Sequence, residues 1–300
     1  MSDFRFDNRV AVITGAGGGL GRAHALMLAA RGAKVVVNDL GGNPDGSGEG
    51  GSSMADAVVA EIKAAGGEAT ANYDSVDSWE GGESIIKTAI DTYGKLDIVI
   101  NNAGILRDRT MMNMSSEEYN RVMDIHVDGS WYVARAAVPP LRENNYGRVI
   151  FTSSGAGLWG NFGQTNYSTA KMAVVGMMLA MKLEMAKYNC HVNVISPLAA
   201  SRLLGTVMTD EQMETLNPDY VAAMVVYLCS EHCTENGGIF LAGGGNFAKA
   251  QMVANDGVTV EKRGDISVEN IAMNIDEITD MTDARPYPDA GGRRVKMAES

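Results

Sequence analysis

The chain is poor in cysteine, with only Cys190, Cys229 and Cys233 among its 300 residues. So few thiols exclude a disulfide-stabilised framework and indicate a reducing compartment. The sequence also lacks any apolar stretch long enough to span a membrane, and its N-terminus, MSDFRFDNRV, has no apolar core of the signal-peptide type. The expected location is therefore the cytoplasm.

Basic residues are outnumbered, because 25 Lys and Arg face 37 Asp and Glu and leave a net charge of −12. A negative chain is poorly suited to nucleic acid or to an anionic membrane, so neither is expected as a partner. The hydrophobic share of 45% and the charged share of 21% are typical of a soluble globular protein with a large core. One large domain is expected.

Short apolar runs recur along the chain, and helical patterns follow them. The runs are continuous rather than alternating, which is typical of strands buried on both faces of a sheet. They predict an α/β fold, a doubly wound parallel sheet of seven strands (Rossmann fold) with crossover helices. The runs are VAVITG, KVVVND, the weaker EATANYD, LDIVINNAG, RVIFTSS, VNVISP and GIFLAGG.

The first predicted strand runs into a glycine-rich turn, TGAGGGLG, in which Gly15, Gly19 and Gly21 accompany a helical pattern over Leu20–Arg31. Glycine lets the backbone approach a pyrophosphate closely, and the free N–H groups of the following helix meet its charge. Asp39 ends the next strand about 20 residues further on, where a carboxylate accepts hydrogen bonds from an adenosine ribose. This spacing predicts a dinucleotide site; the alternatives are a tight turn and a loop-capping acid.

Asp39 also indicates which dinucleotide is bound. Its carboxylate would repel the 2′-phosphate of NADP, and neither Gly18 nor Leu40 offers a basic group for that phosphate. We therefore predict NAD as the cofactor. Directly after this strand, the segment GGNPDGSGEGGSS, from Gly41 to Ser53, is predicted to be a flexible insertion in a surface loop.

A tyrosine and a lysine stand four residues apart in the segment GQTNYSTAKM. Residues four apart share one face of a helix, so Tyr167 and Lys171 would present a phenol beside an ammonium group. The helix itself is predicted by the apolar residues that line one side of the segment, Ala170, Val174, Met177 and Met181.

A phenol with the ordinary pKa of about 10 is a poor proton acceptor near neutral pH. Lowering that pKa by about three units takes roughly 4 kcal/mol, whereas one exposed lysine pairing supplies about 1 kcal/mol or less. The remainder would come from a second positive charge in a dry pocket, and an oxidised nicotinamide ring carries one. The pair Tyr167 and Lys171 is therefore expected beside NAD.

Polar residues at the ends of neighbouring strands complete the predicted site. Ser154 ends the strand RVIFTSS, thirteen residues before Tyr167, at the edge where open α/β sheets bind ligands. Its hydroxyl would hold the substrate oxygen while Tyr167 exchanges the proton, and Ser153 is the competing candidate. The NNAG segment, residues 101–104, suits a backbone close to the cofactor ribose. Asp74 either meets the adenine amino group or faces solvent.

The cluster CSEHC contains Cys229, His232 and Cys233 and raises the question of zinc. The two cysteines lie four apart on a predicted helix, and the chain has no second pair of cysteines with metal-ligand spacing. Free cysteine packs well as a small apolar side chain. We therefore predict no metal site.

The strand pattern stops after about Phe247. We accordingly predict an NAD-binding domain over residues 1–250 and a C-terminal extension over residues 251–300, partly helical and partly irregular. One amphipathic helix in an acidic stretch is predicted from Ile271, Ile275 and Ile278. The segment after it, DARPYPDAGGRRVKMAES, is predicted to be irregular.

Taken together, these motifs resemble the short-chain dehydrogenase/reductase family. The resemblance covers residues 8–247 and rests on TGAGGGLG, NNAG and the spacing of Ser with Tyr-x3-Lys. More narrowly, NDLGG, NNAGILRDR, GNFGQTNYSTAK and ENGGIF are similar to the (3R)-hydroxyacyl-CoA dehydrogenase branch, that of peroxisomal multifunctional enzyme type 2 and its bacterial relatives. The branch implies acyl-CoA thioesters of fatty acids or steroid side chains as substrates, and the family implies a homodimer or homotetramer.

The resemblance implies a role for each matching residue. Tyr167 would be the catalytic acid/base, Lys171 would lower its pKa and bind the nicotinamide ribose, and Ser154 would orient the substrate oxygen. The expected reaction is NAD-dependent oxidation of (3R)-3-hydroxyacyl-CoA to 3-oxoacyl-CoA. NAD would be held by Tyr167 and Lys171 together with Gly15, Gly19, Leu20, Gly21, Asp39, Asp74, Asn101, Ala103, Gly104 and Pro197.

The sequence departs from the family pattern at two places. His126, in IHVDG, stands where the family usually has a catalytic asparagine, and both a buried structural histidine and a proton relay are open readings. After the sixth strand, SPLAASR replaces the usual Pro-Gly. The apolar residues there either close over an acyl chain or pack as an ordinary amphipathic helix: Leu198, Leu203, Leu204, Val207 and Met208.

Two other functions stay open at this stage. The predicted catalytic residues would serve a free hydroxysteroid or another secondary alcohol equally well. Arg107, Arg109 and Arg202 are candidate partners for CoA phosphates, although an acidic chain gives this little support. The alternative from another class is a catalytically silent NAD-binding scaffold, which the intact set of serine, tyrosine and lysine disfavours.

Overall fold

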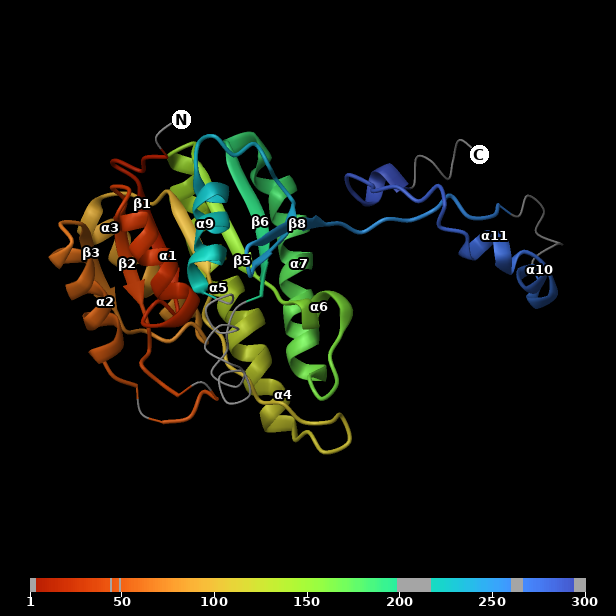
Figure 1. The fold of residues 1–300 in the computed structure, drawn as a ribbon, viewed down its shortest axis with the longest axis horizontal. Coiled ribbons are helices and arrows are strands. Elements are labelled where there is room, and N and C mark those ends of the chain that lie inside the picture. Colours follow the sequence, from red (N-terminus) through yellow and green to blue (C-terminus); the bar gives the residue numbers. More distant parts are fainter. Residues whose placement is uncertain (1–3, 44, 49, 199–216, 260–266, 294–300) are drawn as a thin grey trace. The chain divides into compact units, whose positions relative to one another are not determined.

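A twisted sheet of eight strands forms the centre of the fold (Figure 1), in the order β3-β2-β1-β4-β5-β6-β7-β8. The computed structural model describes residues 4–43, 45–48, 50–198, 217–259 and 267–293. The strands are β1 (Val10–Thr14), β2 (Lys34–Asn38), β3 (Glu68–Asn72), β4 (Ile98–Asn101), β5 (Gly147–Thr152), β6 (Cys190–Pro197), β7 (Ile239–Gly243) and β8 (Asn246–Ala250).

Strands β1 to β7 pair in parallel, which confirms the predicted doubly wound sheet and its seven strands. The strands β1, β4 and β5 are buried along their whole length. Helices cover both faces of the sheet, and this two-sided burial explains why the apolar runs do not alternate with polar residues. Because the strands are parallel, the segments that follow β1, β2, β4 and β5 meet at one edge.

The helices form two layers around this sheet (Figure 1). Helix α1 packs against α2 and α9 on one face, whereas α3 packs against α5, and α5 against α7, on the other. The helices of the first unit are α1 (Gly19–Ala29), α2 (Ser53–Ala64), α3 (Trp79–Tyr93), α4 (Ser116–Met123), α5 (Gly129–Glu143), α6 (Gly155–Trp159), α7 (Thr165–Met185) and α9 (Pro218–Cys229), with a π-helix η1 (Asp124–Asp128) and a 3₁₀ turn η2 (Ala186–Tyr188). In the described ranges, none of the helices is both long and apolar enough to cross a membrane.

The sheet has one strand more than the sequence predicts. Strand β8 follows β7 after the two residues Gly244 and Gly245, both with positive φ, and a connection of two residues joins antiparallel neighbours. The five residues of β8, NFAKA, are largely exposed, and they carry no continuous apolar run. This exposure at the edge of the sheet explains why the apolar pattern stops one strand too early.

The cysteine cluster does not lie on one helix, contrary to the prediction. Helix α9 ends at Cys229, and Ser230 after it has an extended backbone, so Cys233 lies in the turn that follows. Both side chains are buried and free, and burial raises the pKa of both thiols. The imidazole of His232 stacks edge-on against Phe4 at 5.0 Å between ring centroids. Among the described residues, no group of three or more His, Cys, Asp or Glu is arranged to hold a metal ion.

The chain divides into two compact units, Met1–Lys249 and Ala250–Ser300. In the second unit, the predicted single helix is two short ones, α10 (Val268–Met273) and α11 (Ile275–Thr279). The helix breaks at Asn274, whose side-chain amide donates a hydrogen bond of 2.7 Å to the carbonyl oxygen of Asn270. An asparagine that bonds to the backbone in this way competes with the helical pattern.

His24 gives the fold a built-in sensitivity to acid. Its side chain on α1 is fully buried, neither ring nitrogen has a hydrogen-bond partner, and burial lowers its pKa to about 3. Since the unfolded chain binds this proton near pH 6.5 and the folded chain only near pH 3, acid favours unfolding between these values, by roughly 1.4 kcal/mol per pH unit.

We expect His24→Met to remove that component of the acid sensitivity. Urea unfolding at pH 6.0 and pH 4.5 should show the wild type losing about 2 kcal/mol more stability than the variant over this interval. The variant should also be more stable than the wild type at pH 7, because it has no buried imidazole without a partner. Equal losses in the two proteins would show that His24 does not set this acid response.

Candidate active site

The turn between β1 and α1 forms one end of a deep pocket. Gly15 has a φ of +63°, and a Cβ there would lie 2.9 Å from the Cα of Ala103, so only glycine fits. Helix α1 begins at Gly19 without a side-chain cap and without an acidic residue in its first turn. Its free N–H groups therefore open onto the pocket, as an anion site requires.

Gly21 acts inside the turn rather than at its surface. A Cβ at Gly21 would lie 2.2 Å from the carbonyl oxygen of Gly15, and the residue does not line the pocket. The glycine spacing thus combines two functions, because Gly15 and Gly19 shape the pocket wall while Gly21 lets α1 pack closely against the turn.

Asp39 is held at the pocket wall by two backbone N–H groups. Its carboxylate oxygens accept hydrogen bonds of 2.8 Å from Gly17 and 2.8 Å from Gly41. Among the described residues that line the pocket, the basic side chains are Arg121, His126 and Lys171, and Arg121 is paired with Asp77. A carboxylate fixed in this position suits a ribose with free hydroxyls better than one with a 2′-phosphate.

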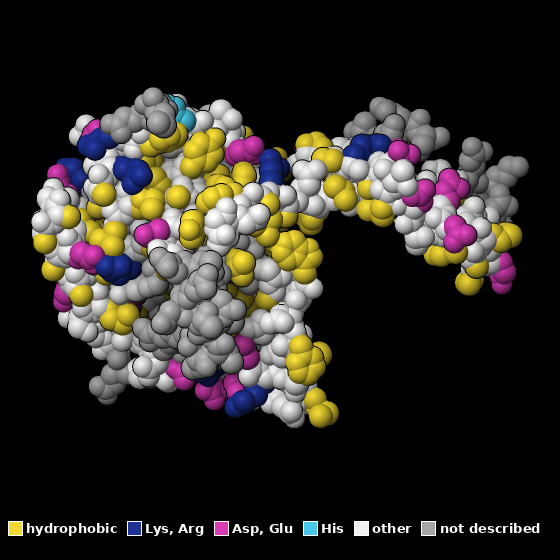
Figure 2. Space-filling model, in the orientation of Figure 1, with side chains coloured by type: hydrophobic (Ala, Val, Ile, Leu, Met, Phe, Trp, Pro, Cys, Tyr) yellow, Lys and Arg dark blue, Asp and Glu magenta, His cyan; other side chains and the backbone are white. Residues whose placement is uncertain are grey.

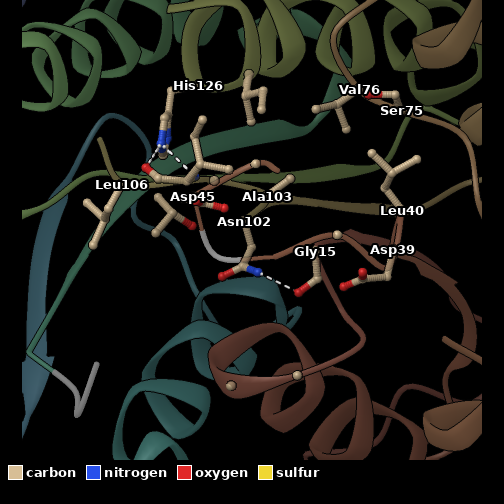
Figure 3. Close-up of a pocket in the computed structure, with 18 of the residues that line it drawn as sticks. Gly15, Asp39, Leu40, Asp45, Ser75, Val76, Asn102, Ala103, Leu106 and His126 are labelled. Atoms are coloured by element: carbon tan, nitrogen blue, oxygen red, sulfur yellow. Dashed lines mark hydrogen bonds between the residues drawn. The ribbon is translucent and has the colours of Figure 1, made fainter. Parts of the chain in front are cut away.

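Asp74 is fixed by the strand ends beneath it. Its carboxylate accepts a hydrogen bond of 2.8 Å from the side chain of Asn72, and its carbonyl oxygen accepts one of 2.9 Å from Asn38. Asp74, Ser75 and Val76 all line the pocket, and Figure 3 shows Ser75 and Val76 side by side in its wall. The residues that follow β2 and β3 thus form one continuous wall.

Of the two asparagines at the end of β4, Asn101 is the last residue of the strand and Asn102, the residue after it, lies in the pocket wall. Asn102 lines the pocket and donates hydrogen bonds of 3.0 Å to the carbonyl oxygen of Thr14 and 3.1 Å to that of Gly15 (Figure 3). Asn101 is buried inside the sheet, and neither atom of its side-chain amide has a partner. Neighbouring residues of a strand point to opposite sides of the sheet, so only one of the two asparagines can face the pocket. The sequence NNAG does not show which one it is.

Tyr167 lines the other end of the pocket, whereas Ser154 is not among the residues that line it. The Ser154 hydroxyl caps α6, accepting a hydrogen bond of 3.2 Å from the backbone N–H of Ala156, and its interaction with the Tyr167 hydroxyl lowers the pKa of that phenol. The competing candidate, Ser153, is buried and donates a hydrogen bond of 2.7 Å to the carbonyl oxygen of Lys171. Ser153 lines the pocket and Ser154 does not, but the Ser153 proton is committed to the backbone of α7, which favours Ser154 as the residue that donates to a substrate.

Lys171 lies on the same face of α7 as Tyr167, as the spacing predicts. Its ammonium nitrogen lies 5.6 Å from the centre of the Tyr167 ring and donates a hydrogen bond of 2.7 Å to the carbonyl oxygen of Thr152. The side chain is buried, and burial lowers the pKa of Lys171 to about 7. The group is thus poised between its charged and neutral forms near physiological pH.

Burial raises the pKa of Tyr167, the hydrogen bond from Ser154 lowers it in part, and the charge of Asp108 raises it again. In the protein by itself, Tyr167 accordingly keeps its proton.

His126 is a buried ring at the centre of the site. It lies in the π-helix η1, its Nε2 lies 3.1 Å from the backbone nitrogen and 2.9 Å from the carbonyl oxygen of Ile105, and its Nδ1 has no partner (Figure 3). Burial and the charge of Lys171 hold its pKa well below 6.5, so the ring is neutral. It packs edge-on against Tyr167 at 5.3 Å between ring centroids.

Gly104 makes room for this histidine. A Cβ there would lie 2.3 Å from Cε1 of His126, so the ring occupies the space of an absent side chain. His126 therefore anchors the segment after β4, a structural role; a π-helix in place of regular α-helix is frequent at functional sites.

The pocket that these elements enclose has a volume of about 730 Å³, within the usual range for small-molecule and cofactor sites. Three of the predicted site residues, Gly21, Asn101 and Ser154, do not line it. The predicted residues that do line it are Gly15, Gly19, Leu20, Asp39, Asp74, Ala103, Gly104, Tyr167, Lys171 and Pro197.

The glycine-rich insertion is more than the surface loop that the sequence predicts, because part of it forms a wall of the pocket. Gly42, Asn43, Asp45, Gly46 and Gly48 all line the cavity. Composition alone could not show this, since glycine and serine permit many backbone paths and do not indicate which one is taken.

Of the apolar residues predicted to close over an acyl chain, Leu198 is exposed at 61%, and the other four lie outside the described residues. Arg202, a candidate for CoA phosphates, also lies outside them. Arg107 is already engaged by Glu117 at 3.3 Å, whereas the side chain of Arg109 is 62% exposed.

Comparison with known proteins finds relatives that cover most of this chain. The chain is 49% identical over 284 residues to the mouse peroxisomal multifunctional enzyme type 2, covering 94% of this chain but 38% of that one. It is 36% identical over 251 residues to the hydroxyacyl-CoA dehydrogenase ChsB1 of Mycobacterium tuberculosis, covering 79% of this chain and 77% of that one. The chain thus spans less than half of the mouse protein.

The structure of a 7α-hydroxysteroid dehydrogenase complexed with NADH and 7-oxo glycochenodeoxycholic acid superposes with a TM-score of 0.72 and 28% identity, covering 81% of this chain and 96% of that one. Residues 9–216 match the short chain dehydrogenase family. This chain therefore belongs to the short-chain dehydrogenase/reductase family, whose members are oxidoreductases that act on CH–OH groups with a nicotinamide cofactor.

Proposed function

We propose that this protein oxidises (3R)-3-hydroxyacyl-CoA to 3-oxoacyl-CoA with NAD, in the β-oxidation of fatty acids or steroid side chains. The observation that carries the proposal is the pair Tyr167 and Lys171 in the pocket wall, 5.6 Å from ring centre to ammonium nitrogen, with Ser154 close enough to lower the pKa of the Tyr167 phenol. The substrate class is supported by the likeness to a hydroxyacyl-CoA dehydrogenase and to a multifunctional enzyme of type 2.

The pocket fits a dinucleotide in three respects. The start of α1 is uncapped and meets the charge of a pyrophosphate, and a close approach of the backbone there depends on the glycines of the turn. Asp39 presents a fixed carboxylate to a ribose, and Asp74 is placed for an adenine amino group. Residues Ala103, Gly104 and Pro197 line the path between the two ends.

Bound NAD supplies the hydride acceptor for the carbinol carbon of the substrate. The protein's own residues orient the substrate and transfer the proton. Ser154 donates a hydrogen bond to the substrate oxygen, and Tyr167, once deprotonated, takes the hydroxyl proton as the C–H bond breaks. The buried Lys171, when protonated, adds positive charge 5.6 Å from the centre of the phenol ring, and a buried charge acts at a lower effective dielectric than an exposed one.

The preference for NAD over NADP is part of the proposal. A 2′-phosphate would approach the Asp39 carboxylate, whose two oxygens are already fixed by backbone N–H groups and cannot turn away. Measured with each coenzyme at equal concentration, NAD should give the higher kcat/KM.

A direct assay tests the proposed reaction. Purified protein, NAD and a (3R)-3-hydroxyacyl-CoA should produce the absorbance of NADH, and the (3S) enantiomer should not. A series of acyl chain lengths run with NAD and with NADP would identify the preferred pair. Absence of NADH with every thioester, alongside turnover of another alcohol, would overturn the substrate assignment.

The second candidate is a free hydroxysteroid or another secondary alcohol, because the related structure with NADH holds a bile-acid steroid. Comparing the rates on a hydroxyacyl-CoA and on its hydrolysed free acid distinguishes the two. Equal rates on the two compounds would favour a free secondary alcohol as the substrate. A much lower rate on the free acid would favour the CoA thioester. Membership of a family of oxidoreductases favours both over the scaffold alternative.

We further infer that the protein acts in the cytoplasm as a homodimer or homotetramer. The free, buried cysteines support a reducing compartment, and the oligomer is inferred from family resemblance alone. Light scattering of the purified protein and fractionation of cells test these two points. The mouse relative is named as peroxisomal, so recovery in an organelle fraction would overturn the location.

A further inference from the structure

The described residues of the glycine-rich insertion, 41–43, 45–48 and 50–53, fold back as a compact loop. At its base, the N–H of Gly51 donates a hydrogen bond of 2.8 Å to the carbonyl oxygen of Leu40. At its tip, the N–H of Asn43 bonds to the carbonyl oxygen of Ser47 at 3.0 Å, and the Asp45 carboxylate accepts bonds of 2.9 and 2.6 Å from Ser47. These bonds define a looped segment with a definite tip.

The tip of this loop reaches the segment that follows β4. The Nε of Arg107 donates a hydrogen bond of 2.9 Å to the carbonyl oxygen of Asp45. A Cβ at Gly46, where φ is +74°, would lie 3.1 Å from the Ile105 side chain, so the tip sits closely against this segment. Figure 3 shows Asp45 on the side of the pocket where Ala103 and Leu106 lie, away from Asp39.

The sheet topology then fixes what the loop crosses. The loop starts at the end of β2 and its tip lies at the end of β4, and β1 lies between these two strands in the sheet. The loop therefore passes over the carboxyl end of β1, where Gly15 and the uncapped start of α1 face the pocket. Its inner residues line the same cavity.

Arg107 also touches the catalytic helix through its backbone. Its carbonyl oxygen accepts a hydrogen bond of 2.8 Å from the side chain of Asn166, which is fully buried. The carbonyl group of the Asn166 side chain accepts a bond of 2.8 Å from the N–H of Tyr167. One residue thus joins the insertion to the neighbour of the proposed acid/base.

We propose that the insertion is a strap, that is, a loop that covers the bound coenzyme, and that the Arg107 guanidinium holds this loop in place. The strap must move away from the Ile105 side chain before a dinucleotide bound beneath it can dissociate. Arg107 is in this view a positioning residue, which acts through the loop and not on the substrate. The inference rests on the proposed NAD site and adds the control of coenzyme release.

The rate of NADH dissociation tests this inference without turnover. Bound NADH is followed by its fluorescence in a stopped-flow experiment, with excess NAD as the displacing ligand. Arg107→Gln removes the charged donor to Asp45 and should raise the dissociation rate about tenfold, the effect of losing one hydrogen bond from a charged group. Gly46→Val, which pushes the tip away from Ile105 by another route, should do the same.

Arg109→Gln is the matched control, because it makes the same change of charge two residues along. Its side chain pairs with Glu118 at 3.3 Å and does not contact the loop, so NADH should leave at the wild-type rate. Wild-type release rates in both Arg107→Gln and Gly46→Val would overturn the strap while leaving the coenzyme site standing. If NADH fails to bind the wild type, the proposed function itself is wrong.

Discussion

Replacing Tyr167 by phenylalanine should lower kcat by about 10²- to 10⁴-fold, the usual contribution of a positioned acid/base. Phenylalanine keeps the ring and its edge-on contact with His126 and loses only the hydroxyl, whose pKa Ser154 lowers. The affinity for NADH should therefore change by less than a few-fold. Turnover measured by NADH absorbance, with binding measured by fluorescence, separates the two effects.

Ser153→Ala serves as the control for this experiment. Its hydroxyl bonds to the backbone of Lys171, so the variant should lose stability rather than the catalytic step. Ser154→Ala, in contrast, should lower kcat, since it removes the proposed partner of the substrate oxygen. A Tyr167→Phe variant with near wild-type turnover would show that another group moves the proton.

Lys171→Met should lower kcat/KM by at least about 10²-fold, because the phenol then loses the protein's own cation and the nicotinamide ribose loses its proposed ligand. The buried ammonium bonds to the carbonyl oxygen of Thr152, a contact that methionine cannot make. Steady-state rates across the pH range give this loss. If the pH–rate profile of the variant had its maximum at the same pH and the same rate as the wild type, the proposed role of Lys171 would be contradicted.

The same variant should change how stability depends on pH. The pKa of Lys171 is about 7 in the folded protein and 10.5 in its ordinary state, so the unfolded chain binds the proton more tightly between these values. Stability should therefore rise with pH over this window, by about 2 kcal/mol between pH 7.5 and 9. Urea unfolding of Lys171→Met should lack that rise, and a parallel rise in both proteins would assign it to other groups.

Elements buried on both faces could be predicted from the sequence. The residues of β1, β4 and β5 are apolar without alternation because each side meets a helix layer. The site at the carboxyl edge follows from the same fact, because parallel strands bring the ends of β1, β2 and β5 together. Gly15 and Asp39 at the strand ends and Tyr167 on α7 are predicted at this edge, and all three line the pocket.

Residues whose role depends on contacts across the fold could not be predicted. Strand β8 is exposed and has no apolar run, and the break at Asn274 comes from a single side-chain bond. Likewise, only coordinates show that Ser153 donates to the backbone of Lys171, or that Asn102 rather than Asn101 faces the pocket. The path of the insertion over β1 depends on where Arg107 lies.

The energetics of the phenol connect these observations. Burial raises the pKa of Tyr167 in the protein alone, and burial also lowers the pKa of Lys171 to about 7. Neither shift favours a phenolate, so the proposed mechanism requires the positive charge of an oxidised nicotinamide to make one accessible. In that mechanism, proton transfer depends on occupancy of the coenzyme pocket.

The pH dependence of kcat/KM for the hydroxyacyl-CoA, measured at saturating NAD, tests this account most directly. We predict that activity rises with the loss of one proton at a pH well below the ordinary phenol value of about 10, and that Tyr167→Phe abolishes this ionisation. A profile in which no group ionises below that value, or one that the variant leaves unchanged, would contradict it.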